Sequence, residues 1–496
     1  MTRLVRNMAA AAVAAGAMAW TVRAEQTTIT VDPAREVGPI KILNAVNNGP
    51  SVDKPKGDQV CGNARDYKAA RFPYARLHDS IDCCPGGAHA VDITAIFPDF
   101  DADENDPKSY DFAFTDAYLK AIEASGTKVF YRLGQTIEHG PKKYGSIPPK
   151  DFAKWARICE HVIRHYNEGW ADGFKMGIEY WEIWNEPNID FGYEKDGKWI
   201  DDLDHVPEGG SRCWGGSANQ FFAFYETAAK HLKGKFPALK IGGPALCGVP
   251  VSWFRPFLAR MQKNAVPLDF FSWHEYGICP DGAVRVARLV RKELDAHGFA
   301  KTESILNEWN YVRGWQDDFV YSLRAESGDL NLVGGAYCAS MLTTLQNEPV
   351  DMLMYYDARV GAAMNGLFER TSLWPQKTYY ALYAWAKLLD RGRQVSAVVT
   401  GDNAPCRGFR YLPVGAVAAK GKDGSLGIYV SRYMADLNQV EPRTIRLAVK
   451  GRSLAGAVCH VTDDRRMYTE TALEVDADGS ATLVLQPRAY AFVEVK

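Results

Sequence analysis

Two glutamates stand at the ends of apolar, aromatic segments that are otherwise typical of buried strands. Glu186 ends the apolar part of YWEIWNEPNI (180–189), and Glu308 holds a similar place in SILNEWNY (304–311). When two such acids share a cavity, repulsion and lost hydration raise the pKa of one, which can donate a proton, while the other stays charged and can attack. The pair predicts glycosidic bond hydrolysis, with retention at a carboxyl separation of about 5–5.5 Å and inversion at a wider one.

Other polar and aromatic residues at the ends of comparable segments are candidates for substrate binding. An amide beside an acid can hold a sugar 2-hydroxyl, which suggests this role for Asn185. His274 and Tyr276 can orient the nucleophile by hydrogen bonds. Trp309 or Trp184 can form the floor of a sugar site, or can equally pack between strands and helices. The full predicted set is Arg76, His78, Asn185, His274, Tyr276, Trp309 and Asp357.

The elements that must position these residues are eight short apolar runs, which alternate with longer segments of helical period. Several of the longer segments end on Gly or Pro, as helices do. Eight strand–helix units over roughly 350 residues predict a (β/α)8 TIM barrel, an α/β fold whose active sites lie at the C-terminal ends of its strands. A doubly wound open sheet is the alternative, but no Gly-rich dinucleotide loop follows the first run. The runs span 40–48, 74–79, 129–134, 180–187, 239–245, 269–277, 304–311 and 352–359.

The character of the chain changes near residue 393. From there on, short strand-like segments are separated by Gly, Asp and Asn turns, which predicts a C-terminal β-sandwich domain over 393–496. The barrel domain is then expected over 36–392. Residues 26–35 are also strand-like, and we expect that they can join the sandwich rather than the barrel.

The N-terminus has the pattern of a secretory signal peptide. Basic residues are followed by a short, Ala-rich apolar stretch and then by small residues, and the apolar run is too short to span a membrane. We expect a signal over 1–24, cleaved after Ala24 or alternatively after Ala19. The mature protein is then expected to be secreted or periplasmic, in a bacterium, without a membrane span.

Composition excludes some partners. A net charge of -2 leaves no basic footprint for nucleic acid. The ten cysteines fit no metal-binding spacing. Because an exported protein can form disulfides, we expect that Cys83 or Cys84 can pair with Cys61 or Cys213. We expect no metal and no cofactor, and a carbohydrate as the partner; the sequence is compatible with a homo-oligomer.

Three segments carry a resemblance to a known family. WEIWNEPN, FFSWHEYG and ILNEWNY, in this order, resemble the clan A retaining glycosidases, and within that clan glycoside hydrolase family 39, the family of β-xylosidases and α-L-iduronidases. The resemblance covers about 36–390 and, less fully, the sandwich. It implies that Glu186 is the general acid/base at the end of strand four and that Glu308 is the nucleophile at the end of strand seven.

The same resemblance implies roles for neighbouring residues. Asn185, His274 and Tyr276 fall where the family places sugar and nucleophile contacts, and ARLHD supplies Arg76 and His78 as in the family's second strand. One departure follows strand eight, where family xylosidases carry a pair of acids that bind sugar hydroxyls. Here YYDARVGAAMNG offers Asp357 and no adjacent acid pair, which weakens the expectation that xylose is the sugar.

The expected function is therefore retaining hydrolysis of O-glycosidic bonds in plant or microbial oligo- or polysaccharides, exo-acting and xylosidase-like. A transglycosylase or an endo-acting glycanase on the same scaffold would use the same two acids. A non-catalytic carbohydrate-binding protein is the alternative from another class, but it would not need both acids. The sequence leaves the sugar and its anomer open.

Overall fold

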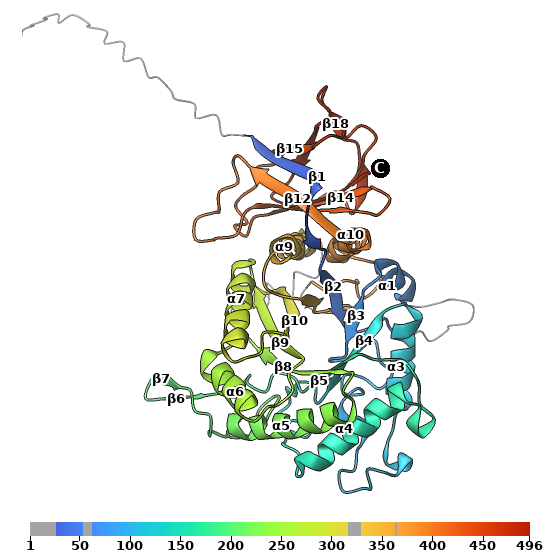
Figure 1. Ribbon diagram of the computed structural model, residues 1–496, viewed down its shortest axis with the longest axis vertical. Coiled ribbons are helices and arrows are strands. Elements are labelled where there is room, and N and C mark those ends of the chain that lie inside the picture. Colours follow the sequence, from blue (N-terminus) through green and yellow to red (C-terminus); the bar gives the residue numbers. More distant parts are fainter. Residues whose placement is uncertain (1–25, 53–61, 316–328, 363–364) are drawn as a thin grey trace, which may run out of the picture.

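The computed structural model describes residues 26–52, 62–315, 329–362 and 365–496, apart from the side chains of 329 and 330 (Figure 1). The expected signal peptide and Cys61 lie outside the described residues. A barrel and a β-sheet domain stack along the long axis, with two helices between them.

Eight parallel strands close into a barrel in the order β10-β11-β2-β3-β4-β5-β8-β9. Each lies within or close to one of the eight predicted runs, so the predicted barrel is confirmed and the open sheet is wrong. The barrel strands are β2 (Ile42–Asn47), β3 (Tyr74–Arg76), β4 (Lys128–Leu133), β5 (Tyr180–Ile183), β8 (Lys240–Cys247), β9 (Phe270–Gly277), β10 (Glu303–Tyr311) and β11 (Met352–Tyr355).

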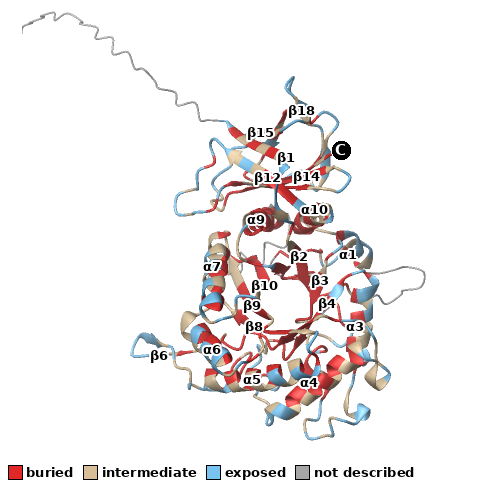
Figure 2. Ribbon diagram, viewed as in Figure 1, coloured by how far each residue is buried: buried red, intermediate tan, exposed pale blue. Residues whose placement is uncertain are grey.

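Helices surround the barrel, and most of them bury one face against it; α9 (Asp329–Leu345), which lies between the barrel and the sheet, is buried on nearly all sides over its described side chains (Figure 2). Local capping fixes where several begin: Asp151 accepts a hydrogen bond from Lys154 N at the start of α4, and Ser217 accepts one from Gln220 N at the start of α5. The α-helices are α1 (Ala64–Ala70), α2 (Ile93–Ile96), α3 (Ala113–Ala124), α4 (Phe152–Asn167), α5 (Ala218–Lys235), α6 (Val251–Lys263), α7 (Asp281–Ala296), α9 (Asp329–Leu345) and α10 (Lys377–Arg391). Two 3-10 turns are η1 (Pro107–Ser109) and η2 (Trp170–Asp172).

The second domain is a ten-stranded mixed sheet that encloses its own apolar core. β1 pairs antiparallel with β12 and parallel with β15, so the N-terminal strand belongs to this domain and not to the barrel. The strands are β1 (Thr27–Pro39), β12 (Arg393–Thr400), β13 (Val414–Lys420), β14 (Leu426–Tyr433), β15 (Arg443–Val449), β16 (Val458–Thr462), β17 (Thr469–Thr471), β18 (Glu474–Val475), β19 (Ala481–Leu485) and β20 (Arg488–Val495). A separate hairpin, β6 (Tyr193–Lys195) and β7 (Lys198–Ile200), projects from the barrel beside α6 (Figure 1).

Helices α9 and α10 join the two domains. The Tyr429 hydroxyl donates to Ala381 O at 3.2 Å, and the Thr343 and Ser431 hydroxyls lie 2.8 Å apart. Lys387 forms an ion pair with Glu494 at 2.8 Å. The sheet therefore covers the side of the barrel formed by its last two helices.

The cysteine prediction is wrong for Cys213. Cys83, Cys84 and Cys213 are all free thiols. Cys84 Sγ donates to Phe114 O in α3, whereas Cys213 lies beyond β5, where its carbonyl accepts from Trp184 Nε1, so different loops separate the sulfur atoms. Within the described ranges, no helix combines the length and the apolar character needed to cross a bilayer.

Candidate active site

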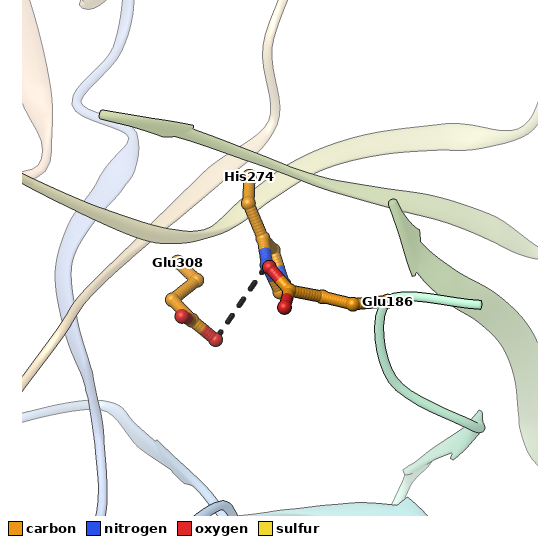
Figure 3. A group of neighbouring side chains, drawn as sticks. All are labelled: Glu186, His274 and Glu308. Carbon is orange, nitrogen blue, oxygen red and sulfur yellow. Dashed lines mark hydrogen bonds and ion pairs between the residues drawn. The ribbon is translucent and has the colours of Figure 1, made fainter. Parts of the chain in front are cut away.

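Glu186 and Glu308 face one another at the C-terminal end of the barrel. Glu186 follows β5, Glu308 lies in β10, and both are 6% exposed. One carboxylate oxygen of each and a ring nitrogen of His274 all lie within 4.8 Å of one another, and Figure 3 shows the three side chains converging. This closeness suits two acids that flank a single glycosidic bond with retention.

Glu308 is held by a cation and a hydroxyl. Arg76 Nη1 donates to Glu308 Oε2 at 3.2 Å, and the Tyr276 hydroxyl donates to Oε1. Arg76 is itself fixed, because its Nε donates to Glu182 Oε2 at 2.6 Å and its Nη2 donates to Asn185 Oδ1 at 2.7 Å. Both contacts on Glu308 favour the ionised carboxylate.

Glu186 has a less charged environment. His274 Nδ1 lies 2.8 Å from Glu186 Oε1 and 3.6 Å from Glu308 Oε2, so this ring is bonded to the predicted acid rather than to the predicted nucleophile. Glu186 N donates to Ala245 O at 2.9 Å, which ties the loop after β5 to β8. The thiol of Cys247 completes the contacts of this carboxyl.

These surroundings separate the two acids electrostatically. Burial raises the pKa of Glu186 to about 7, although Cys247 and Arg76 oppose the rise. Burial lowers the pKa of His274 to about 4, so the ring is neutral at pH 7 and adds no compensating charge. Burial also raises the pKa of Glu308, but Arg76 and Tyr276 oppose it there. A proton shared by the pair is therefore held on Glu186.

A third buried acid, Glu182, was not among the predicted residues. Its Oε1 accepts from Ser272 Oγ at 2.6 Å and from Asn307 Nδ2 at 2.5 Å, and its Oε2 accepts from Arg76 Nε. Glu182 thus positions the arginine that contacts Glu308. The sequence did contain a signal, because Glu182 is an acid in the middle of the apolar run that leads to Glu186.

Three buried polar atoms at the site find no hydrogen-bond partner among the residues that the structure describes. They are Asn185 Nδ2, His78 Nδ1 and His274 Nε2. The other ring nitrogen of His78 lies 4.0 Å from Glu308 Oε2, and burial holds the pKa of His78 well below its usual value. Because unpaired buried polar groups are costly, such groups commonly have a functional role.

Asp357 lies in an ionic network. Its Oδ2 accepts from Arg359 Nε at 2.6 Å and from Asn48 Nδ2 at 3.2 Å. Arg359 also pairs with Asp79 at 2.8 Å, and the Tyr356 hydroxyl donates to Asp79 at 3.1 Å. Asp357 is therefore neutralised by an arginine two residues further along the chain.

The structure contradicts the prediction that Trp309 forms the floor of the sugar site. Trp309 is 0% exposed and packs against Tyr355 and Tyr337, with ring centroids 5.0 and 6.1 Å away, in the layer between strands and helices. Trp184 packs in a similar way, 5.2 Å from Trp214. The aromatic side chain that does reach the site was missed: Trp315 is 56% exposed and meets Tyr276 edge-on at 5.1 Å.

The spacing of Glu186, His274 and Glu308 would also permit a divalent cation. Two contacts argue for proton chemistry instead. The imidazole nitrogen already pairs with Glu186, and the Arg76 guanidinium, 3.2 Å from Glu308, would repel a second cation.

Solved structures share this architecture. A glucosidase from Croceicoccus marinus superimposes with a TM-score of 0.71 at 22% identity, over 95% of this chain and 98% of that one. A GH39 beta-xylosidase from Caulobacter crescentus does so with a TM-score of 0.62 at 19% identity, over 95% and 99%. At these identities the match concerns the fold, which is that of barrel glycosidases with an appended β-domain.

Sequence comparison matches part of the chain to a family model. Residues 87–312 match the model of Glycosyl hydrolases family 39. It is 27% identical to a beta-xylosidase of Geobacillus stearothermophilus over 256 residues, which are 48% of this chain and 46% of that protein. It is 28% identical to a beta-xylosidase of Caldicellulosiruptor saccharolyticus over 163 residues, 32% of this chain and 26% of that protein. The chain thus spans less than half the length of these relatives.

Proposed function

We propose that this protein is a retaining glycoside hydrolase in which Glu186 is the general acid/base and Glu308 is the nucleophile. The observation that carries the proposal is the pair of facing carboxylates within 4.8 Å, one beside a neutral imidazole and the other beside a guanidinium. The match of residues 87–312 to the model of Glycosyl hydrolases family 39 supports the same reaction class.

In the first step, Glu186 donates its proton to the glycosidic oxygen and the bond from that oxygen to the anomeric carbon breaks. Glu308 attacks the anomeric carbon from the other side and forms a glycosyl ester, while the protonated leaving group departs. The unpaired Nδ2 of Asn185 is suited to donate to the sugar 2-hydroxyl, because Arg76 already occupies the amide oxygen.

In the second step, Glu186 is a carboxylate and accepts a proton from water. The water oxygen bonds to the anomeric carbon, and the ester bond to Glu308 breaks, which releases the sugar with its anomeric configuration retained. Arg76 and Tyr276 stabilise the returning negative charge on Glu308. This sequence of steps requires no cofactor.

For the substrate, we propose exo-acting hydrolysis of xylosidase type, since both curated relatives above are beta-xylosidases. The sequence carries no adjacent acid pair after the eighth barrel strand; Asp357 and Arg359 lie there and form an ionic network with Asp79, which can select another pentose or hexose. We also propose that residues 1–24 export the protein from a bacterial cytoplasm.

A transglycosylase would share the two steps of the mechanism, with a sugar replacing water in the second. Product analysis with excess acceptor distinguishes it from a hydrolase.

The test combines a substrate screen with chemical rescue. Aryl xyloside, arabinopyranoside, galactoside and glucuronide identify the sugar. On the best of these, Glu186→Ala should lose activity and regain it with azide, which needs no general base, and the product should be a glycosyl azide of retained configuration. An absence of rescue together with an inverted hydrolysis product in the wild type would contradict the mechanism.

A further inference from the structure

A pocket of about 370 Å³ lies beside Glu186. Its wall comes from the loop after β5, from the end of β8 and the loop that leads to α6, from the end of β9, from the second turn of α7, and from the β6–β7 hairpin with the residues just after it. The polar and aromatic residues that matter for its chemistry are Asn188, Trp199, Asp201, Cys247, Glu275 and Arg285. None of these residues takes part in the two steps described above.

The pocket shares a wall with the predicted acid/base. Cys247 lines the pocket, and its thiol lies within hydrogen-bonding reach of the Glu186 carboxyl. Asn188, two residues after Glu186, fixes this wall because its side-chain amide donates to Cys247 O at 2.9 Å and accepts from Cys247 N at 3.0 Å. A general acid protonates the leaving-group oxygen, so a pocket on its side is placed to receive the leaving group.

Trp199 presents an aromatic surface to this pocket. It is 64% exposed, although large aromatic side chains are usually buried. Its Nε1 donates to Asp201 at 2.9 Å, and the indole lies against Gly192, where an added Cβ would come within 2.7 Å of Nε1. Gly192 has a φ of +85°, so both backbone and space require glycine there. The indole is thus held in place while much of its surface stays open.

Glu275 and Arg285 provide polar groups elsewhere on the wall of the same pocket. Burial raises the pKa of Glu275, although Arg285 opposes the rise. The Glu275 carboxyl lies over the first turn of α7, where an added Cβ on Gly282 would be 2.4 Å from its Oε1. A carboxylate and a guanidinium beside an aromatic face can bind sugar hydroxyls and the apolar face of a pyranose together. Two acids, Glu275 and Asp201, against one arginine disfavour an anionic ligand.

We infer that this pocket is a leaving-group subsite, in which Trp199 stacks on a neutral sugar unit and Glu275 and Arg285 bind its hydroxyls. This inference rests on the proposed glycosidase function, because only that function gives the pocket a leaving group. The subsite selects a glycosyl leaving group over a smaller one. Both the β6–β7 hairpin and the barrel contribute residues to the subsite.

The test compares a substrate that has a sugar leaving group with one that has none. Wild type and Trp199→Ala are assayed on 1,4-β-xylobiose and on β-xylosyl fluoride, or on the corresponding pair if the screen selects another sugar. Fluoride is a single atom and cannot use the subsite. We expect kcat/KM for the disaccharide to fall about tenfold, as loss of one aromatic stacking contact implies. Hydrolysis of the fluoride should be unchanged, which also shows that the variant is folded.

Two further variants sharpen the test. Trp199→Phe keeps a ring but loses the Nε1 bond, so it should retain most activity on the disaccharide. Trp374→Ala removes another exposed tryptophan, 74% exposed and outside the pocket, and should change neither activity. The inference is overturned if Trp199→Ala leaves disaccharide hydrolysis unchanged, or lowers both activities equally. A wild type that hydrolyses no glycoside in the screen overturns the proposed function, and the inference with it.

Discussion

The asymmetry between Glu186 and Glu308 arises from single contacts. Arg76 lies 3.2 Å from Glu308, whereas the nearest ring to Glu186 is His274, whose pKa falls to about 4 on burial. Both acids are equally buried, so burial alone does not distinguish them. The positive charge and the hydroxyl of Tyr276 next to Glu308 leave the proton on Glu186.

This arrangement lowers stability at high pH. The pKa of Glu186 rises from 4.5 to about 7 on folding, so the ionised folded protein is destabilised by about 3 kcal/mol. The penalty is absent below pH 4.5, where the carboxyl is protonated in both states, and is complete above pH 7. Glu186→Gln should therefore raise the free energy of unfolding by about that amount above pH 7 and change it little below pH 4.5.

Denaturant unfolding above pH 7 and below pH 4.5 measures this difference. Glu138→Gln is the control, because it should change the free energy of unfolding in the opposite direction. Burial raises the pKa of Glu138, but hydrogen bonds from Ser146, Gly145 and Tyr144 lower it further, so its folded pKa lies below 4.5. The Glu138 carboxylate therefore stabilises the fold above pH 4.5, and its replacement should lower the free energy of unfolding in that pH range. Equal stability of wild type and Glu186→Gln above pH 7 would contradict a raised pKa.

At the scale of elements, strand ends and the loops after them hold the acids. Glu186 has a φ of 45° and its hydrogen-bond partner Ala245 a φ of 56°, so both adopt a left-handed conformation that side chains rarely take. Strained backbone of this kind needs support from its surroundings. Asn188 supplies part of it through its two hydrogen bonds to Cys247.

Asn188→Ala should consequently disturb Glu186 without touching it. The two backbone groups of Cys247 lose their partners, which costs about 1–3 kcal/mol for each group left buried and unpaired. We expect kcat/KM on an aryl glycoside with a poor leaving group to fall more than kcat/KM on a glycosyl fluoride, because kcat/KM reports the first step and only the aryl glycoside needs an aligned acid in that step. A variant with both rates unchanged would show that the loop after β5 holds Glu186 unaided.

The sequence predicted these elements well, since each of the eight barrel strands lies within or close to one of the predicted apolar runs. The orientation of side chains in β10 could not be predicted in the same way. The register of this strand shifts between Leu306 and Glu308, so Asn307 bonds Glu182 inside the barrel and the next residue also faces inward. Trp309 is then turned outward. Simple alternation does not anticipate such an irregularity.

Contacts between distant segments were also beyond the sequence pattern. Glu182 in β5, Asn47 in β2 and Asn185 in the loop after β5 all bind one guanidinium, that of Arg76. The pattern identified Asn185 because it adjoins an acid. It gave no reason to single out Asn47, whose role depends on the neighbouring strands.

At the scale of the whole molecule, the sheet has a core of its own and also packs one set of side chains into the core of the barrel. Tyr429, Tyr433, Tyr490 and Phe492 of the sheet belong to the same buried cluster as the barrel helices. A shared core couples the two domains, so unfolding of one exposes apolar surface of the other. We expect a single cooperative unfolding transition.

Phe492→Ala tests this coupling from the sheet side. Its ring is 0% exposed, and its removal should cost about 3–5 kcal/mol. Far-ultraviolet circular dichroism and loss of glycosidase activity should shift together to lower temperature, because the barrel depends on the same core. The alternative outcome is that the variant loses activity at the same temperature as the wild type, while part of its dichroism transition shifts to lower temperature. That result would show that the domains unfold independently.

The central claim is that Glu308 forms a covalent bond with the sugar, and trapping that bond tests it most directly. A 2-deoxy-2-fluoro glycoside with a good leaving group slows both steps but the second more, so the ester accumulates. Mass spectrometry of the digested protein should locate one added fluorosugar on Glu308, and Glu308→Gln should take up none. A label on another residue, or wild-type turnover without any covalent adduct, would contradict the account.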